Sequence, residues 1–324
     1  MHAGTARIRA GALVALAAAA LGGAAATAQA AVPAVSTGSA AKVAPQSATL
    51  RGSVNPKGKA AVYYFQYGLS KAYGTQTPEV GAGAGTKSVA AHADVLGLTP
   101  AKTYHFRIVA RNADGTVLGG DKTFKTKPQP LGFSLAATPN PVTFGDDVIL
   151  QGVLSGTGNS GRQVALQGNV FPYIGGFKTI GNPQVTGATG AFSFPLLNAI
   201  TKTQYRVVTA AGTKVTSSVV ALGVAVDVST RASAHRVRKG HRVRFAGTVH
   251  PAKRGSLFAV QRRDRHGNWI TLAGGTSKGG AAGFSRYERR VKIRHSGDYR
   301  VFVGVADGYQ VSGIGRTVHI RAHS

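Results

Sequence analysis

Basic side chains alternate with apolar ones at two places near the C-terminal end of the chain. The first run flanks Val237 and Val243, and the second flanks Val291 and Ile293. On a β-strand, alternate side chains point to opposite faces, so this pattern predicts a sheet face covered with cations. The residues predicted for this face are Arg236, Arg238, Arg242, Arg244, Arg290, Lys292 and Arg294. Such a face attracts polyanions, and the attraction weakens as the salt concentration rises.

The positive charge of the whole chain is concentrated in the same segment. The 324 residues carry 39 Lys and Arg against 11 Asp and Glu, a formal net charge of +28, and residues 225–324 hold 20 of these basic and five of these acidic residues. We expect anionic cell-surface or extracellular polymers as partners, while a role in solubility alone stays open. Specific nucleic-acid recognition is not predicted, because no known recognition motif accompanies the charge.

Two aromatic residues are candidates for stacking on a sugar ring. Trp269 is the single tryptophan of the chain, and Tyr64 belongs to the aromatic run 63–67. Packing in a β core is the competing interpretation, because buried aromatics dominate small cores. The alternative function is therefore a carbohydrate-binding or accessory module of an extracellular polysaccharide-processing system.

Catalytic and metal-binding chemistry has little material in this sequence. There is no cysteine, which removes thiol nucleophiles and Cys-ligated metals. The histidines do not combine with carboxylates at the spacing of metal ligands, and Asp264-Arg265-His266-Gly267 predicts a hairpin turn. We predict a protein that is not an enzyme, with no catalytic residue, metal or cofactor.

The N-terminal residues have the order of a secretory signal peptide. Arg7 and Arg9 precede an apolar run over 12–21, and Ala28-Gln29-Ala30 supplies small residues at a cleavage site. The sequence therefore predicts a signal peptide over 1–30 and a secreted, extracellular chain without a membrane span. Its basic segment predicts retention at the cell wall by charge.

The remaining sequence predicts β structure throughout. Short runs with period-two alternation are separated by Gly, Pro, Asn and Asp at intervals of about eight to twelve residues, which is typical of β-sandwiches. Pro128 and Pro130 break the chain at one point, and a softer break lies near 223–229. The predicted fold class is all-β, with three tandem sandwich domains over 33–127, 131–224 and 225–322.

The second and third of these segments repeat each other. Gly152 corresponds to Gly247 at an offset of 95, and Gln167 corresponds to Gln261 at an offset of 94. At an offset of 92, Phe177 aligns with Trp269, and Phe192-Ser193 aligns with Phe284-Ser285. A duplicated domain accounts for offsets that vary so little.

The first segment resembles a fibronectin type III domain of secreted bacterial proteins. The resemblance is carried by Leu98-Thr99-Pro100-Ala101-Lys102-Thr103-Tyr104, followed by Phe106, Ile108 and Ala110. It implies that Tyr104 forms the tyrosine corner, a hydroxyl hydrogen bond that ties a loop to the next strand. The tryptophan usual in the second strand is absent from this segment.

The repeated pair resembles the immunoglobulin-like modules of secreted actinobacterial-type proteins. The motifs are Gly-x-x-Val-x-x-x-Gly, then Gly-x-x-Val-x-x-Gln, then Gly-x-Phe-Ser and Tyr-Arg-Val; in the third segment Phe258 takes the place of the second motif's valine. These resemblances imply fold only, because such modules host many roles. Our leading expectation is a secreted, non-enzymatic structural or adhesion module with a basic C-terminal domain.

Overall fold

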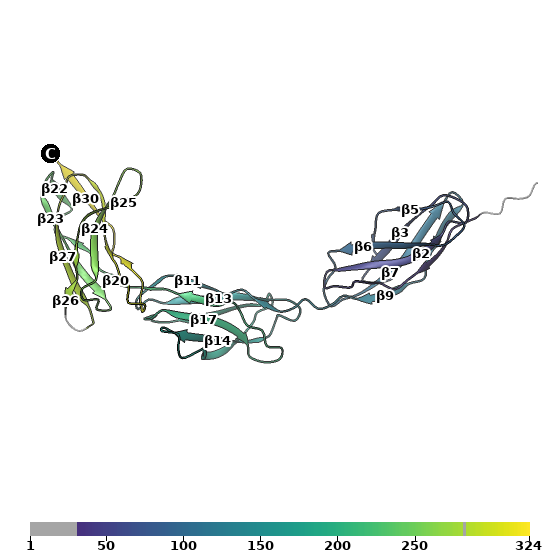
Figure 1. Cartoon of the computed structure of the whole chain (residues 1–324), viewed down its shortest axis with the longest axis horizontal. Helices are drawn as coiled ribbons and strands as arrows, with labels where there is room; N and C mark the ends of the chain where they lie inside the picture. The colour runs from purple at the N-terminus through teal and green to yellow at the C-terminus, as the bar shows by residue number, and fades with distance from the viewer. Residues whose placement is uncertain (1–30, 281–282) are drawn as a thin grey trace, which may run out of the picture. The chain divides into compact units, whose positions relative to one another are not determined.

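The computed structural model describes residues 31–280 and 283–324, and within these ranges every helix or strand assigned is a β-strand (Figure 1). The predicted all-β fold class is confirmed. The predicted signal peptide lies outside the described residues. Among the described residues, no helix has the length and hydropathy to cross a bilayer. The chain divides into two compact units, one ending with Lys102–Thr126 and one that contains Lys127–Ser324.

The first unit, which we call the first module, is a sandwich of two antiparallel sheets. One sheet has the order β1-β2-β6, and the other has the order β4-β3-β7-β8, with β5 also pairing β3 and β9 also pairing β7. A three-stranded sheet therefore faces a sheet of six strands. The strands are β1 (Ala34–Thr37), β2 (Ser47–Asn55), β3 (Ala61–Gly68), β4 (Thr75–Gln76), β5 (Val80–Gly83), β6 (Val89–Leu96), β7 (Thr103–Asn112), β8 (Gly115–Leu118) and β9 (Lys122–Lys125).

Alternation along β3 and β7 builds the core of the first module. Phe65, Phe106 and Ile108 are completely buried. Tyr104 is also buried and stacks on Phe124, with ring centroids 5.6 Å apart. The tyrosine-corner role of Tyr104 stays a prediction.

The second module begins after Pro130 and pairs its strands as an immunoglobulin-like sandwich. One sheet contains β10, β11, β13 and β16, and the other has the order β15-β14-β17-β18. A short parallel pair, β12 with β19, closes one side. The strands are β10 (Gly132–Phe133), β11 (Ala136–Thr138), β12 (Val142–Thr143), β13 (Val148–Ser155), β14 (Gln163–Val170), β15 (Lys178–Val185), β16 (Ala191–Leu196), β17 (Thr203–Thr209), β18 (Val220–Leu222) and β19 (Val224–Ala225).

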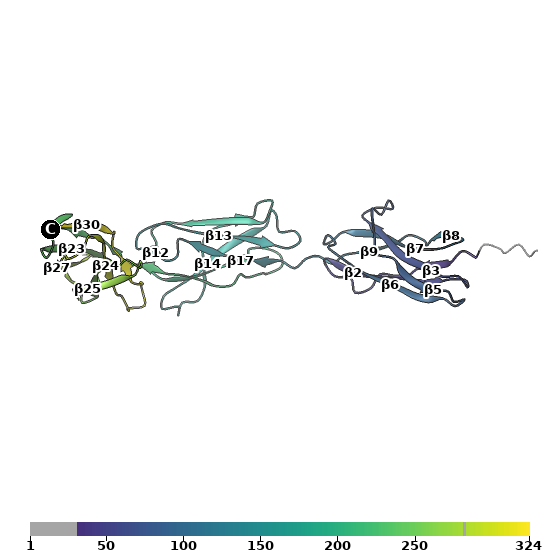
Figure 2. The ribbon, with the colours of Figure 1, turned by 90° about the horizontal axis from the view of Figure 1, so that it is seen from above.

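The third module repeats this plan. One sheet has the order β20-β23-β27-β26 with β21 on β23, and the other has the order β22-β30-β28-β24-β25 with β29 on β28. In both views β23 and β27 lie on one side and β24, β25 and β30 on the other (Figures 1 and 2). The strands are β20 (Asp227–Val228), β21 (Arg231–Ala232), β22 (Arg236–Arg238), β23 (Arg242–His250), β24 (Leu257–Arg263), β25 (Trp269–Thr276), β26 (Lys278–Gly279), β27 (Ser285–Lys292), β28 (Gly297–Val303), β29 (Gly313–Ile314) and β30 (Val318–His323).

Each of these two modules has its own hydrophobic core. The core of the second module includes Leu150, Phe194 and Val224, and the core of the third includes Val226, Phe245 and Val301. The chain therefore changes cores within two residues, between Val224 and Val226. The folding of each module rests on its own buried surface.

The strand register corrects one part of the sequence repeat. Gly152 lies opposite Phe192 on β16, and Gly247 lies opposite Tyr287 on β27. The structural counterpart of Phe192 is therefore Tyr287, and the match to Phe284 was wrong by three residues. A Phe-Ser pair occurs near the start of each of the two strands, and the sequence alignment matched these two pairs to each other. The cross-strand pairing sets a different register.

Both glycines in this repeat are required by close approach of the backbone. A Cβ placed on Gly152 would lie 2.0 Å from the carbonyl oxygen of Ser134, and one on Gly247 would lie 1.9 Å from that of Ser229. These distances are too short for any side chain, so only glycine fits. The same close backbone approach at both glycines shows that the two modules share one backbone arrangement, which we call the frame.

Candidate polyanion-binding surface

The sheet that carries β23 and β27 presents cations to solvent. Arg242 and Arg244 on β23 and Arg290 and Lys292 on β27 are exposed, while their neighbours in sequence, such as Val243 and Val291, are buried. The alternation read from the sequence is confirmed for these four residues. Period two on a half-buried strand positions them, because the apolar face has to meet the core.

Arg236 and Arg238 lie in a different sheet, so one shared face for all seven predicted cations is wrong. Their strand β22 pairs in parallel with β30, where Arg236 lies opposite Arg321. The residues between β22 and β23 cross from one sheet to the other instead of forming a hairpin. Gly240, with φ of 89°, makes this crossing and donates its N–H to the carbonyl of Ile293 at 2.7 Å.

Three pairs of like charges lie directly opposite each other on neighbouring strands. Arg242 faces Lys292 and Arg244 faces Arg290 across β23 and β27, and Lys278 faces Arg286 across β26 and β27. Opposite positions bring Cβ atoms to within about 5 Å, where like charges destabilise a sheet. Glu288 offsets part of this repulsion through an ion pair with Arg244 at 3.3 Å.

A hollow of about 620 Å³ opens beside the C-terminal half of β27, and we call it the edge hollow. Its described lining contains no acidic residue. The basic lining residues are Arg242, Arg289, Arg290, Lys292 and Arg294, and the others are Leu272, Ala273 and Val291. Nothing in this lining neutralises the cations, so an anion would be attracted to the hollow.

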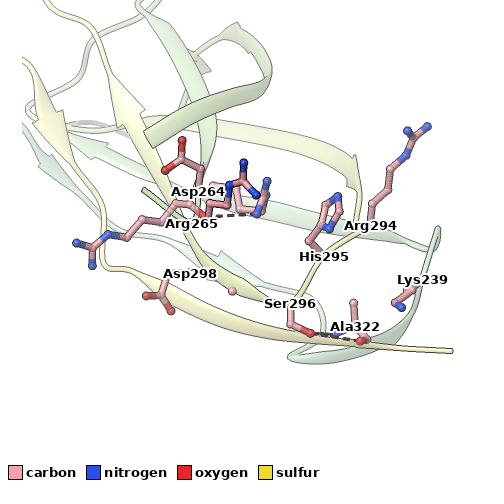
Figure 3. Close-up of a pocket in the computed structure, with 11 residues that line it drawn as sticks. Lys239, Asp264, Arg265, Arg294, His295, Ser296, Asp298 and Ala322 are labelled. Carbon is pink, nitrogen blue, oxygen red and sulfur yellow. Dashed lines mark hydrogen bonds between the residues drawn. The ribbon is translucent and has the colours of Figure 1, made fainter. Parts of the chain in front are cut away.

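A second hollow of about 840 Å³, the end hollow, lies at the tip of the third module, where the turn after β24 approaches the segment after β27 (Figure 3). Figure 3 shows Asp264 and Arg265 on one side and Arg294, His295 and Lys239 on the other. Arg262 and Arg263 complete its basic lining. Arg294 lines the edge hollow as well, so the two hollows adjoin.

The third hollow, about 1220 Å³, lies over the outer face of β23 and β27, and we call it the sheet hollow. Small residues such as Ala246, Gly247 and Thr248 form its floor. Its basic lining residues are Arg231, Arg244, Lys278 and Arg286. Glu288 is the one acidic residue among the described lining, and it is paired with Arg244.

The acidic residues near these hollows are engaged elsewhere. Asp264 accepts the backbone N–H groups of His266 at 2.9 Å and Asn268 at 2.8 Å, which confirms the predicted turn. Asp298 pairs with His319 at 2.7 Å. Both carboxylates line the end hollow, but among the described residues neither forms an ion pair with Arg262, Arg263, Arg265 or Arg294, so the lining keeps its excess of positive charge.

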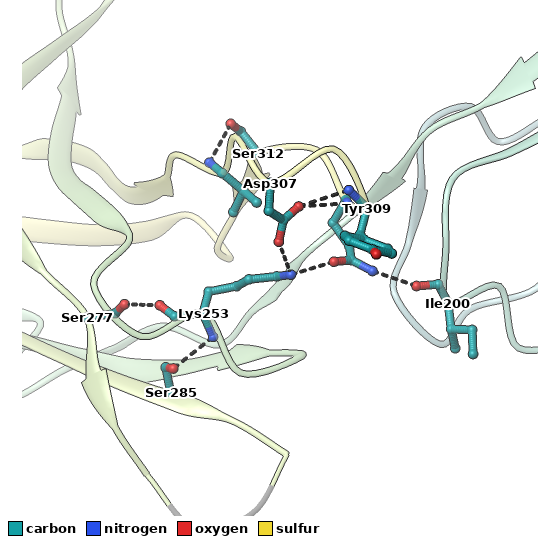
Figure 4. Close-up of polar contacts among 9 residues, drawn as sticks. Ile200, Lys253, Ser277, Ser285, Asp307, Tyr309 and Ser312 are labelled. Atoms are coloured by element: carbon teal, nitrogen blue, oxygen red, sulfur yellow. Dashed lines mark hydrogen bonds and ion pairs between the residues drawn. The ribbon is translucent and has the colours of Figure 1, made fainter. Parts of the chain in front are cut away.

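Lys253 shows what a structural cation looks like in the same module (Figure 4). Its side chain is only 12% exposed and forms an ion pair with Asp307. Its Nζ also donates to Gln310 Oε1 at 2.5 Å, and Gln310 Nε2 donates to the carbonyl of Ile200 at 2.7 Å. Burial alone would raise the pKa of Asp307, but the hydrogen bonds from Lys253 and from the backbone outweigh it and lower this pKa. Within the described lining of the edge and end hollows, no arginine forms an ion pair.

Sequence reasoning missed Arg289. By its position opposite Phe245 it belongs to the inward-facing set of β27, yet it is exposed and lines the edge hollow. The corresponding residue of the second module is the buried Phe194, which lies opposite Leu150. The signal that could have found Arg289 is a charge at an inward position, next to Arg290, in an otherwise alternating strand.

The candidate sugar-stacking residues lie in other surroundings. Trp269 is half-buried, and the guanidinium of Arg300 lies 4.1 Å from its ring centroid, so one face of the ring is covered. Burial lowers the pKa of Arg300. Tyr64 is half-buried on the outer face of β3, opposite Val109. Tyr64 and Trp269 belong to different compact units of the chain.

The arrangement at Trp269 recurs in every module. An arginine donates through Nε to the glutamine opposite it and lies over an aromatic ring: Arg107 with Gln66 and Tyr73, Arg206 with Gln167 and Phe177, and Arg300 with Gln261 and Trp269. The Nε to Oε1 distances are 2.8, 2.9 and 2.9 Å. This repetition indicates a structural role for Trp269 in a cation–π contact.

Within the described part of the chain, no group of three or more His, Asp, Glu or Cys side chains is placed to hold a metal ion. Among the lining residues of the three hollows, arginine and lysine outnumber every acidic group. The chemistry that this surface can perform is the binding of anions.

Comparison with known proteins returned only distant likeness. No family model and no curated protein matches the chain. Domains A168–A170 of titin match at 16% identity over 90% of this chain and 99% of theirs, with a TM-score of 0.38. The FN1–FN3 domains of chicken CNTN1 match at 13% identity over 90% and 100%, with a TM-score of 0.31. The sensor domain of the anti-sigma factor RsgI4 of Pseudobacteroides cellulosolvens matches at 19% identity over 29% and 89%, with a TM-score of 0.23.

Proposed function

We propose that this chain is an exported, non-enzymatic modular protein that is held at the cell surface by its third module, through electrostatic binding to anionic polymers. The first two modules act as structural or adhesion-type modules. The observation that carries the proposal is the edge hollow, where five cations meet with no acidic residue in the described lining. A surface with both signs of charge interspersed would suffice for solubility.

The contrast between modules supports this assignment of roles. Residues 225–324 carry 20 Lys and Arg, against five in residues 129–224, although the two modules share one frame. The charge is therefore a property that the third module has and its sister lacks. Counterion release from a polyanion makes binding to such a surface favourable at low salt and weak at high salt.

Salt-dependent retention is the direct test. The purified chain is passed over immobilised anionic polymer, with an uncharged polysaccharide of the same backbone type as the control matrix. We expect retention at low salt, release as sodium chloride rises from about 50 to 500 mM, and no retention on the control. Retention that does not change with salt would overturn the proposal.

Carbohydrate binding is the competing function, and the same experiment addresses it. Retention on the uncharged matrix that survives high salt and falls on Tyr64→Ala would favour a sugar-stacking site. One face of the Trp269 ring is covered by Arg300, and the same contact between an arginine and an aromatic ring recurs in the other two modules. The carbohydrate-binding alternative therefore has less support. Any turnover of a panel of polysaccharides would contradict the proposal that the chain is not an enzyme.

A further inference from the structure

We infer that the third module binds a flexible, single-chain polyanion along one line, which follows β27 and passes through the sheet, edge and end hollows in that order. The ligand class is a linear polymer with one negative charge per repeating unit, extended on the surface. This inference rests on the proposed function and adds to it the path, the length and the flexibility of the ligand.

The line is continuous because a single segment supplies cations to all three hollows. Arg286 lines the sheet hollow, Arg290 and Lys292 line the edge hollow, and Arg294 lines both the edge hollow and the end hollow. Successive outward positions on a strand are about 6.6 Å apart. From Arg286 to Arg294 the path is therefore about 26 Å long.

Strand β23 supplies a second row of cations beside the first. Arg244 lies opposite Arg290, and Arg242 lies opposite Lys292. An anionic group between the two rows meets a cation on both sides at these two steps, whereas further along β27 Glu288 lies opposite Ala246 and Arg286 lies opposite Thr248. Arginine suits this position, since its guanidinium donates two parallel hydrogen bonds to a phosphate or carboxylate group.

The pairs of like charges on neighbouring strands lower the stability of the sheet, which favours a binding role for these charges. Like charges directly opposite each other destabilise neighbouring strands, and here they occur at two successive pairs of β23 and β27 and at one pair of β26 and β27. Solubility could have been achieved by scattering the same charges over the other sheet. A bound polyanion relieves the repulsion, so binding and stability should be coupled.

The ends of the line favour a flexible ligand over a rigid one. The sheet hollow lies on the outer face of β23 and β27, whereas the end hollow lies at the tip of the module, between the turn at Asp264 and the segment 294–298. A polymer in all three hollows has to turn from the face to the tip. Double-stranded DNA has a persistence length of about 500 Å and does not bend easily over this distance.

The test uses the full chain and inorganic polyphosphate in size fractions whose extended lengths are below, near and above about 26 Å. Affinity should rise steeply with length up to about 26 Å and then level off, apart from a statistical gain for longer chains. The salt dependence should show several contacts, each adding about 0.7 to the slope of log K against log salt. Duplex DNA of equal total charge should bind more weakly.

Single variants locate the line. Arg286→Gln, Arg290→Gln and Arg294→Gln should each weaken polyphosphate binding about threefold and reduce the salt slope by about 0.7. The matched control is Arg321→Gln, which removes one charge from the other sheet and should leave both values nearly unchanged. Thermal unfolding checks the fold, and Arg290→Gln should unfold at the same or a higher temperature because it removes a repulsion from Arg244.

The failures of this inference and of the proposed function can be told apart. If no polyanion binds, both are overturned. If polyphosphate binds but Arg321→Gln weakens it as much as the variants of β27 do, binding reflects net charge only, and the line is overturned while the proposed function stands. Affinity that is independent of length, or duplex DNA that binds as tightly as polyphosphate, also overturns the inference.

Discussion

The second and third modules fold on the same frame and differ in the side chains that one strand carries. In both, a glycine on the first long strand approaches the carbonyl of a serine. In both, an arginine of the other sheet covers an aromatic ring. The strand β16 places Phe192 and Phe194 in the core of the second module. The equivalent positions on β27 hold Tyr287 and Arg289, and only Tyr287 is buried.

This difference shows how a duplicated sandwich can gain a charged surface without losing its core. Phe245 on β23 takes a position that is Leu150 on β13, and it is completely buried. Phe245 fills more of the core than leucine would, while Arg289 on the neighbouring strand is exposed at the surface. This is expected if the sandwich requires a certain total volume of core side chains. The backbone arrangement of the sandwich can therefore stay the same while its surface charge changes.

The largest effect we expect comes from exchanging this one position. Phe194→Arg removes a buried ring and brings a charge to a core that lacks a larger neighbour, so it should lower the free energy of unfolding of the second module by at least about 3 kcal/mol. Calorimetric unfolding measures the loss. The reverse change, Arg289→Phe, should alter stability by less than about 1 kcal/mol and weaken polyphosphate binding.

Phe194→Leu is the control for the exchange, with an expected loss of about 1 kcal/mol. If Phe194→Arg unfolds at the same temperature as Phe194→Leu, the frame of the second module tolerates an arginine as the third does. The tolerance of the third module for Arg289 would then not be explained by the larger volume of Phe245.

The next largest expected effect is the dependence of the third module's stability on pH, which is due to Tyr287. Burial raises the pKa of Tyr287 to about 12, with the hydrogen bond to Thr230 acting in the opposite direction. A pKa raised by folding stabilises the module fully below the unfolded value of about 10, and this contribution is lost as pH rises towards 12. The loss is about 3 kcal/mol. Chemical unfolding followed by Trp269 fluorescence, measured from pH 9 to 12, reports on the third module because Trp269 is the single tryptophan.

Tyr287→Phe restores the residue type of the second module and isolates this contribution. The variant should lose about 1 kcal/mol at neutral pH, because the tyrosine hydroxyl donates to the carbonyl of Ser229 at 2.6 Å. Its stability should then fall less steeply than that of the wild type between pH 10 and 12. Parallel pH profiles for the two proteins would contradict the role given to Tyr287.

The smallest effect concerns the feature that the modules share. Arg300→Met and Arg206→Met each remove a guanidinium that lies 4.1 Å from a ring centroid, which should cost about 0.5–1 kcal/mol in either module. The emission of Trp269 should change in Arg300→Met and stay constant in Arg206→Met. A loss in only one module would show that the contact is not equivalent in the two copies.

Much of the fold could be predicted from local pattern, and the candidate surface only in part. Alternation predicted strands at β3, β7, β23 and β27, and it correctly placed Arg242, Arg244, Arg290 and Lys292 outward. It did not reveal that Arg236 and Arg238 belong to another sheet, because a short Gly-containing connection looks the same whether it forms a hairpin or crosses between sheets. The hollows also draw residues from distant segments, such as Lys239, Arg263 and Arg294, whose proximity no spacing indicates.

The amino-acid sequence by itself determined the β class, the excess of positive charge in residues 225–324 and the outward direction of side chains on individual strands. These are properties of composition and of the two-residue period, both of which are local. Only the tertiary structure decided which strands share a sheet, that Arg289 leaves the core and that the cations of β23 and β27 lie opposite one another. Those outcomes depend on pairing between strands that are distant in sequence, such as the strands of Arg244 and Arg290, and on how core volume is filled.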